Sequence, residues 1–165
     1  MLVLRRAQHE RMPSSSTYRA LRTAAEPLDA WPLEQEAARV TLQRADPRGF
    51  VDALLGDDEV ELAWTAAAAA PDDALGSDLW LRLAERSERD RPADALAVYQ
   101  RIADEVLERA DRRAYHSAAR ILQRARAAAQ PAGELDAFAE YLTGLRERYR
   151  RRPTLIAILD KAGLR

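Results

Sequence analysis

Alanine and leucine recur at spacings of three and four residues from one end of this 165-residue chain to the other. Such spacing places apolar side chains on one face of an α-helix, whereas the period-two alternation of β-branched residues typical of strands is missing. Proline, glycine and aspartate interrupt the pattern at short intervals. Because short connections favour antiparallel neighbours, we expect an all-α fold, an array of about nine helices in antiparallel hairpins.

Residues with capping preferences mark the boundaries of the expected helices. Serine and aspartate accept hydrogen bonds from the free N–H groups at a helix start, and glycine and proline end helices. The expected N-caps are one of Ser14 to Ser16, then Asp46 before Pro47, Ser77 and Asp111. Asp57 and Asp58 should open a helix by opposing the positive end of its dipole. The expected turns include Pro131-Ala132-Gly133.

The apolar stripes predict which faces are buried. A helix over residues 32–45 is expected to bury Leu33, Ala37 and Val40, with Leu42 and Ala45 less well aligned on the same face. The three tryptophans are expected to fill gaps between helices. Trp80 and Leu83 should pack toward Leu96 and Tyr99 as a central core unit. In the last long helix, five apolar residues alternate at steps of three and four and predict a packed seam. They are Leu135, Phe138, Leu142, Leu145 and Tyr149.

The two ends of the chain repeat one pattern. An arginine-rich helix that ends at Arg152 meets Pro153 and a short apolar helix, and near the start residues 5–12 meet Pro13 and then Tyr18 to Leu21. Recurrence of a helix, a breaker and a second helix is typical of stacked helical repeats. The chain is therefore expected to be a single helical-repeat domain over its whole length.

One hairpin matches a known repeat more closely. Trp80, Leu83 and Ala84 lie on its first helix, and Leu96 and Tyr99 lie on its second, in the order typical of tetratricopeptide repeats. The spacing along the chain departs from a strict repeat of about 34 residues. We therefore expect a tetratricopeptide-like α-solenoid rather than a regular array.

The same helices resemble a particular family. The segments that carry the resemblance are residues 79–84, 92–99, 115–122 and 138–142, the run into Pro153-Thr154-Leu155, and the ending 159–164. They are similar to the C-terminal helical region of bacterial SWIM zinc-finger proteins, and residues 9–21 resemble the beginning of that region. In that family a C-x-C and C-x-H zinc module lies upstream and is associated with protein or DNA binding. The resemblance implies a scaffold region without its finger, and the start of the chain in mid-pattern favours a piece of a longer protein.

Composition excludes several chemistries. Cysteine is absent, so disulfides, thiolate zinc sites and a cysteine nucleophile are excluded within these residues. A zinc site or catalytic dyad from His9 and His116 would need folding to unite them with carboxylates. No GxSxG elbow or glycine-rich phosphate loop is present, and the acidic groups at residues 57–61 and 72–73 lack the EF-hand pattern. We expect no enzyme, no metal and no cofactor.

The ends and the overall charge bear on location and origin. The apolar start, residues 1–4, is too short for a signal peptide core or a membrane span, so a cytoplasmic protein without membrane contact is expected. Lys161 is the single lysine beside a large excess of arginine, which is typical of GC-rich bacterial genomes. The net charge is −1, with acidic residues concentrated in residues 50–109 and basic residues in 110–165.

The basic residues include the one candidate interaction site, a run of arginines near the C-terminus. It consists of Arg146, Arg148, Arg150, Arg151 and Arg152. Guanidinium groups bind phosphates through paired hydrogen bonds, so this run could serve a nucleic-acid-binding accessory domain. The simpler interpretation is a basic helix end that complements its own dipole and pairs with the acidic middle of the chain. The preferred function is protein interaction or scaffolding, with another protein or an adjacent domain as partner.

Overall fold

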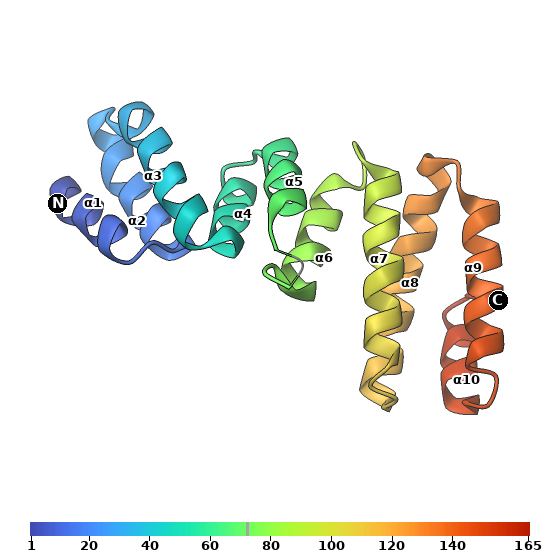
Figure 1. The fold of residues 1–165 in the computed structure, drawn as a ribbon. Helices are drawn as coiled ribbons and strands as arrows, with labels where there is room; N and C mark the ends of the chain where they lie inside the picture. Colours follow the sequence, from blue (N-terminus) through green and yellow to red (C-terminus); the bar gives the residue numbers. More distant parts are fainter. Residues whose placement is uncertain (72) are drawn as a thin grey trace. The chain divides into compact units, whose positions relative to one another are not determined.

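The computed structural model describes residues 1–71 and 73–165, and these residues form helices and connections without a strand. The all-α prediction is therefore confirmed. Ten α-helices and one 3-10 turn follow one another along the chain (Figure 1). They are α1 (Leu2–Arg11), α2 (Ser15–Ala25), the turn Glu26–Leu28, α3 (Trp31–Ala45), α4 (Pro47–Gly56), α5 (Val60–Ala69), α6 (Gly76–Ser87), α7 (Pro92–Leu107), α8 (Arg112–Ala132), α9 (Leu135–Arg148) and α10 (Pro153–Lys161).

The predicted count of nine helices is therefore too low. The difference arises at the N-terminus, where α1 buries only one residue, His9. Its apolar residues Val3 and Leu4 are exposed, so α1 has no apolar stripe facing a core. Helices are counted in the sequence from their apolar faces, so a helix without such a face is missed.

Local capping chemistry explains several boundaries as predicted. Ser14 caps α2 in a reciprocal pair with Thr17, the side chain of Asp46 accepts from the Gly49 N–H at the start of α4, and Asp111 accepts from the Ala114 N–H at the start of α8. Each such cap is worth about 1 kcal/mol. Two boundaries differ slightly. Ser77 lies in the first turn of α6 rather than before it, and α8 continues through Pro131 to end against the left-handed Gly133.

Two predictions about faces and helix starts are wrong. In α3 the buried residues are Trp31, Ala38 and Leu42, so Leu42 is buried as predicted, while Leu33 is 84% exposed and Ala37 is also exposed. The buried face is set by packing on both α2 and α4, which spacing within α3 does not specify. Asp57 does not open α5. It follows the end of α4, and α5 begins only at Val60, so the carboxylate serves a different purpose. Of the second acidic pair, residue 72 lies outside the described residues.

Contacts divide the chain into two compact units, residues 1–79 and 80–165, and α6 begins in the first and ends in the second. In the first unit α2 packs against α1, α3 and α4, and α4 packs against α5. The rings of Tyr18 and Trp31 meet edge to face with their centroids 5.2 Å apart. The core cluster consists of Tyr18, Leu21, Ala25, Trp31, Ala38, Leu42 and Ala53.

The second unit is organised around α8. This helix pairs along its length with α7 and also packs against α9 and α10. Its core includes Leu83, Leu96, Tyr99, Ile102, Leu107, Leu122, Phe138, Leu142, Leu145, Leu155 and Leu159. The predicted seam of α9 is confirmed at its centre, but Leu135 is exposed at its N-terminal end.

The tryptophan predictions hold in part. Trp31 and Trp64 are buried as expected, whereas Trp80 is only half-buried, with the Arg101 guanidinium 5.3 Å above its ring. Trp80 is therefore not fully buried, whereas Leu83, Leu96 and Tyr99, its expected partners, are buried.

Candidate functional site

The predicted arginine run lies at the end of α9 and in the connection to α10, and two of its members are committed to the fold. Arg146 donates to the Leu164 carbonyl at 2.8 Å and to Asp160 at 2.9 Å, which ties the C-terminus to α9. Arg152 donates to the Leu107 carbonyl at 3.1 Å, with its guanidinium 4.7 Å from the centroid of the Tyr149 ring. These two side chains hold corners of the second unit together.

The other three arginines of the run lie at the surface. Arg148 is 3.6 Å from Asp104, and Arg150 donates to Glu147 at 2.7 Å. Within residues 1–71 and 73–165, no ion pair or hydrogen bond involves the side chain of Arg151. Residues 147–152 line an open hollow of about 420 Å³. The structure thus separates the run into two structural and three surface arginines.

A polar hub that sequence reasoning missed lies in the first unit. Asp57, whose side chain is 6% exposed, accepts hydrogen bonds from the Tyr18 hydroxyl at 2.7 Å and from Arg39 at 2.8 Å, and Arg22 also donates to it. The hub joins α2 and α3 to the connection between α4 and α5. No local signal reveals it, because the partners of Asp57 lie 18 to 39 residues away.

The hub changes the acidity of its members. Burial alone raises the pKa of the Asp57 carboxyl, but hydrogen bonds from Arg39 and Tyr18 and the charges of Arg22 and Arg39 outweigh it, so that pKa lies below its usual range. Burial and the hydrogen bond to Asp57 raise the pKa of Tyr18 to about 12. Asp57 is therefore a charged, fully occupied acceptor that stabilises the packing of three segments.

A second polar cluster has the same character in the second unit. The Tyr99 hydroxyl donates to Glu88 at 2.5 Å, and Arg124 donates to Glu88 at 3.0 Å and to Glu85. Burial and the bond to Glu88 raise the pKa of Tyr99. In the part of the chain that the structure describes, no buried side-chain nitrogen or oxygen lacks a hydrogen-bond partner. The buried polar atoms thus serve the fold and leave none aimed at a ligand.

The two histidines lie in different units. His9 is buried, with Nδ1 2.9 Å from the Thr17 hydroxyl and Nε2 3.0 Å from the Ala38 carbonyl, so it bridges α1, α2 and α3. His116 is exposed on α8. Residue 72 aside, no group of three or more histidine, aspartate or glutamate side chains is placed to hold a metal ion. No helix of the described residues is long and apolar enough to cross a membrane.

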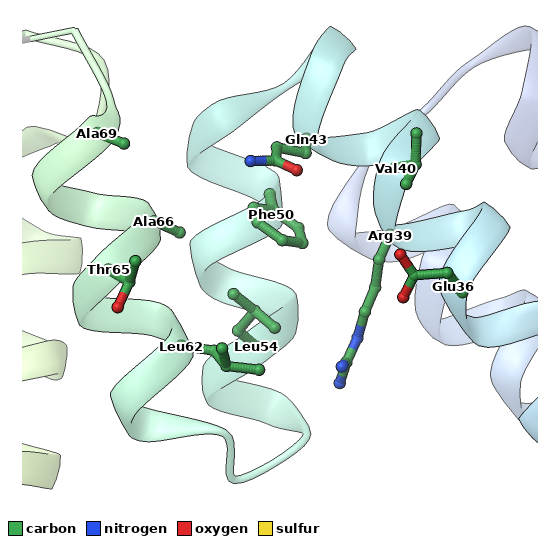
Figure 2. Close-up of a pocket in the computed structure, with 10 residues that line it drawn as sticks. All are labelled: Glu36, Arg39, Val40, Gln43, Phe50, Leu54, Leu62, Thr65, Ala66 and Ala69. Atoms are coloured by element: carbon green, nitrogen blue, oxygen red, sulfur yellow. The ribbon is translucent and has the colours of Figure 1, made fainter.

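An apolar hollow lies in the first unit, and we call it the α4 groove (Figure 2). Its volume is about 260 Å³. In Figure 2, Phe50 and Leu54 form the floor on α4, α5 provides one wall with Leu62, and α3 provides the other wall. The complete lining is Glu36, Arg39, Val40, Gln43, Phe50, Leu54, Leu62, Thr65, Ala66 and Ala69.

Two properties distinguish the α4 groove from an ordinary surface depression. Leu62 is 48% exposed and borders the groove beside Phe50 and Leu54, so burying it under a partner would remove apolar surface from water. Arg39 lines the groove while its guanidinium is fixed by Asp57 and Tyr18, so the polar hub positions a wall of the groove. The sequence held one signal for this site. Residues 60–69 are apolar on nearly every side, which is more than one packed face requires.

No protein-family model matches the chain, and neither the curated proteins nor the solved structures contain a match.

Proposed function

We propose that the chain is a non-catalytic protein-interaction domain whose α4 groove holds an amphipathic helix of a partner protein. The observation that carries this proposal is the apolar floor and wall formed by Phe50, Leu54 and the half-exposed Leu62. Partner helices bind such grooves by inserting apolar side chains spaced three to four residues apart.

The size of the groove supports a helix over a small molecule. Sites for small molecules have volumes of roughly 300–1,000 Å³. The α4 groove, at about 260 Å³, is smaller and open, which suits one or two anchoring side chains of a larger partner. Its polar rim, with Glu36, Arg39 and Gln43 on α3, supplies groups that can orient the flanks of a bound helix.

The wider context belongs to the same proposal. We assign the chain to the tetratricopeptide-like solenoids and to the helical regions of SWIM zinc-finger proteins, as a cytoplasmic scaffold without the finger. The helical hairpins and the residue patterns at 79–99 and 138–164 support this assignment. Nucleic-acid binding through residues 146–152 has weaker support, because Arg146 and Arg152 are engaged by Asp160 and by backbone carbonyls.

A selection experiment tests the groove. A displayed library of helical peptides is selected against the chain, and enriched peptides are measured by fluorescence anisotropy. We expect enriched sequences to share apolar residues at helical spacing and to bind Leu62→Arg at least tenfold more weakly. Leu33→Arg is the matched control, because Leu33 is the more exposed leucine and does not line the groove. Absence of enrichment, or equal loss in both variants, would contradict the proposal.

A further inference from the structure

The second unit brings together two groups of arginines that are far apart in the sequence. Arg109 lies in the α7–α8 connection and Arg112 and Arg113 begin α8, while the surface arginines of the predicted run lie at the end of α9 and in its connection to α10. The hydrogen bond from Arg152 to the Leu107 carbonyl, 3.1 Å long, joins these two connections, and they lie at the same end of the second unit in Figure 1. We call this surface the basic end: Arg109, Arg112, Arg113, Arg148, Arg150 and Arg151.

Within the part of the chain that the structure describes, four of the six arginines form no ion pair, although the carboxylates of Glu108 and Asp111 lie in the α7–α8 connection. All six side chains are exposed, and Arg148 and Arg150 approach Asp104 and Glu147. For the other four, the described residues offer no ion-pair or hydrogen-bond partner. Surface arginines with unsatisfied charge create a positive field that attracts acidic groups.

The arginines at the start of α8 do not serve their own helix. Arg112 and Arg113 are the first two residues of α8, whose first turn contains no acidic residue. Cations at this end oppose the helix dipole, and each unfavourable placement costs a few tenths of a kilocalorie per mole. Helix stability therefore does not explain these residues.

We infer that the basic end binds an acidic segment of a partner protein, a run of aspartate and glutamate side chains. Three observations favour carboxylates over a nucleic-acid backbone. The two arginines here that have partners already pair with carboxylates, from Asp104 and Glu147. The nearby tyrosine, Tyr149, is half-buried and covered by Arg152, so it offers no free ring for base stacking. The patch is confined to the α7–α8 and α9–α10 connections and the helix ends beside them, and does not form a track along the helices.

This surface lies in the second unit and does not depend on the α4 groove. A fluorescein-labelled peptide of alternating Glu and Asp is titrated with the full chain at low and near-physiological salt, beside a single-stranded RNA and a duplex DNA of equal charge. We expect saturable peptide binding that weakens as salt rises and that exceeds binding of either nucleic acid.

The variants identify the surface. Arg112→Gln combined with Arg113→Gln and Arg151→Gln should weaken peptide binding at least tenfold. The control triple Arg44→Gln, Arg89→Gln and Arg120→Gln removes the same charge from exposed positions elsewhere and should change it less than threefold. Leu62→Arg should not weaken it at all, which separates this surface from the groove. The inference would be overturned if both triple variants lost the same peptide affinity, or if either nucleic acid bound more tightly than the peptide. It would also be overturned if self-association of the chain caused the change in fluorescence anisotropy.

Discussion

Replacing Asp57 by alanine tests whether the polar hub stabilises the first unit. The change removes the carboxylate that accepts hydrogen bonds from Tyr18, Arg22 and Arg39. The Tyr18 hydroxyl and the Arg39 guanidinium, which are the less exposed donors, then lose this acceptor. A hydrogen bond to a charged group contributes about 1.5–3 kcal/mol, and the more exposed Arg22 adds about 0.5 kcal/mol. The bonds from Tyr18 and Arg39 together with Arg22 therefore predict a fall of about 3.5–6.5 kcal/mol in the free energy of unfolding, a large share of a typical 5–15 kcal/mol.

Urea unfolding followed by tryptophan fluorescence measures this loss, because the Trp31 ring contacts Tyr18. Glu10→Ala is the control: Glu10 is exposed in the same unit, and surface changes of this kind stay within about 0.5 kcal/mol. The double variant Tyr18→Phe with Asp57→Ala should lose less free energy of unfolding than the sum of the two single variants, because no buried hydroxyl is then left without its acceptor. If Asp57→Ala unfolds within about 0.5 kcal/mol of the wild type, the hub contributes no stability and the reasoning fails.

The same carboxylate predicts a dependence on pH. The pKa of Asp57 is lower in the folded chain than in the unfolded chain, so the folded state binds its proton more weakly. Its contribution is complete above the unfolded pKa of about 3.9 and is lost as pH falls through the folded pKa. Asp57→Asn should therefore show a shallower loss of stability in acid than the wild type.

Two further substitutions test local features. Gly49→Ala should lower the free energy of unfolding by about 1–2 kcal/mol, measured by urea unfolding, because a Cβ there would lie 2.1 Å from the Asp46 carboxylate that caps α4. An unchanged midpoint would show that the cap can move without loss of stability. Trp80→Ala should cost about 2–3 kcal/mol, less than the value of about 3–5 kcal/mol for a fully buried aromatic, because Trp80 is only partly buried beneath Arg101. A loss as large as that of a core residue would contradict this assignment.

The sequence predicted the parts of the fold that depend on neighbours in the chain. The caps at Ser14, Asp46 and Asp111 are recognisable because a helix start needs an acceptor within three residues. The apolar face of α9 follows from spacing alone, except at Leu135 at its N-terminal end. By contrast, the face of α3 depends on two packing partners, and Leu33 was placed on the wrong side for that reason.

The candidate sites depend on contacts that the sequence does not reveal. Asp57 looked like a residue that opens a helix, but its partners come from α2 and α3. The arginine run was recognised as one charged segment, yet only the structure separates Arg146 and Arg152, which bind carbonyls, from the exposed members. The proximity of Arg112 and Arg113 to that run requires the tertiary fold.

The arginine composition of the basic end determines how a complex there can be regulated. Lysine-rich surfaces lose their charge when acetyltransferases modify the amine, but a guanidinium is not a substrate for that reaction and stays protonated at every physiological pH. The single lysine of the chain, Lys161, is not one of the six residues of this surface. The charge of the basic end is therefore constant. Release of an acidic partner would require a rise in ionic strength, a competing polyanion or a change in the partner itself.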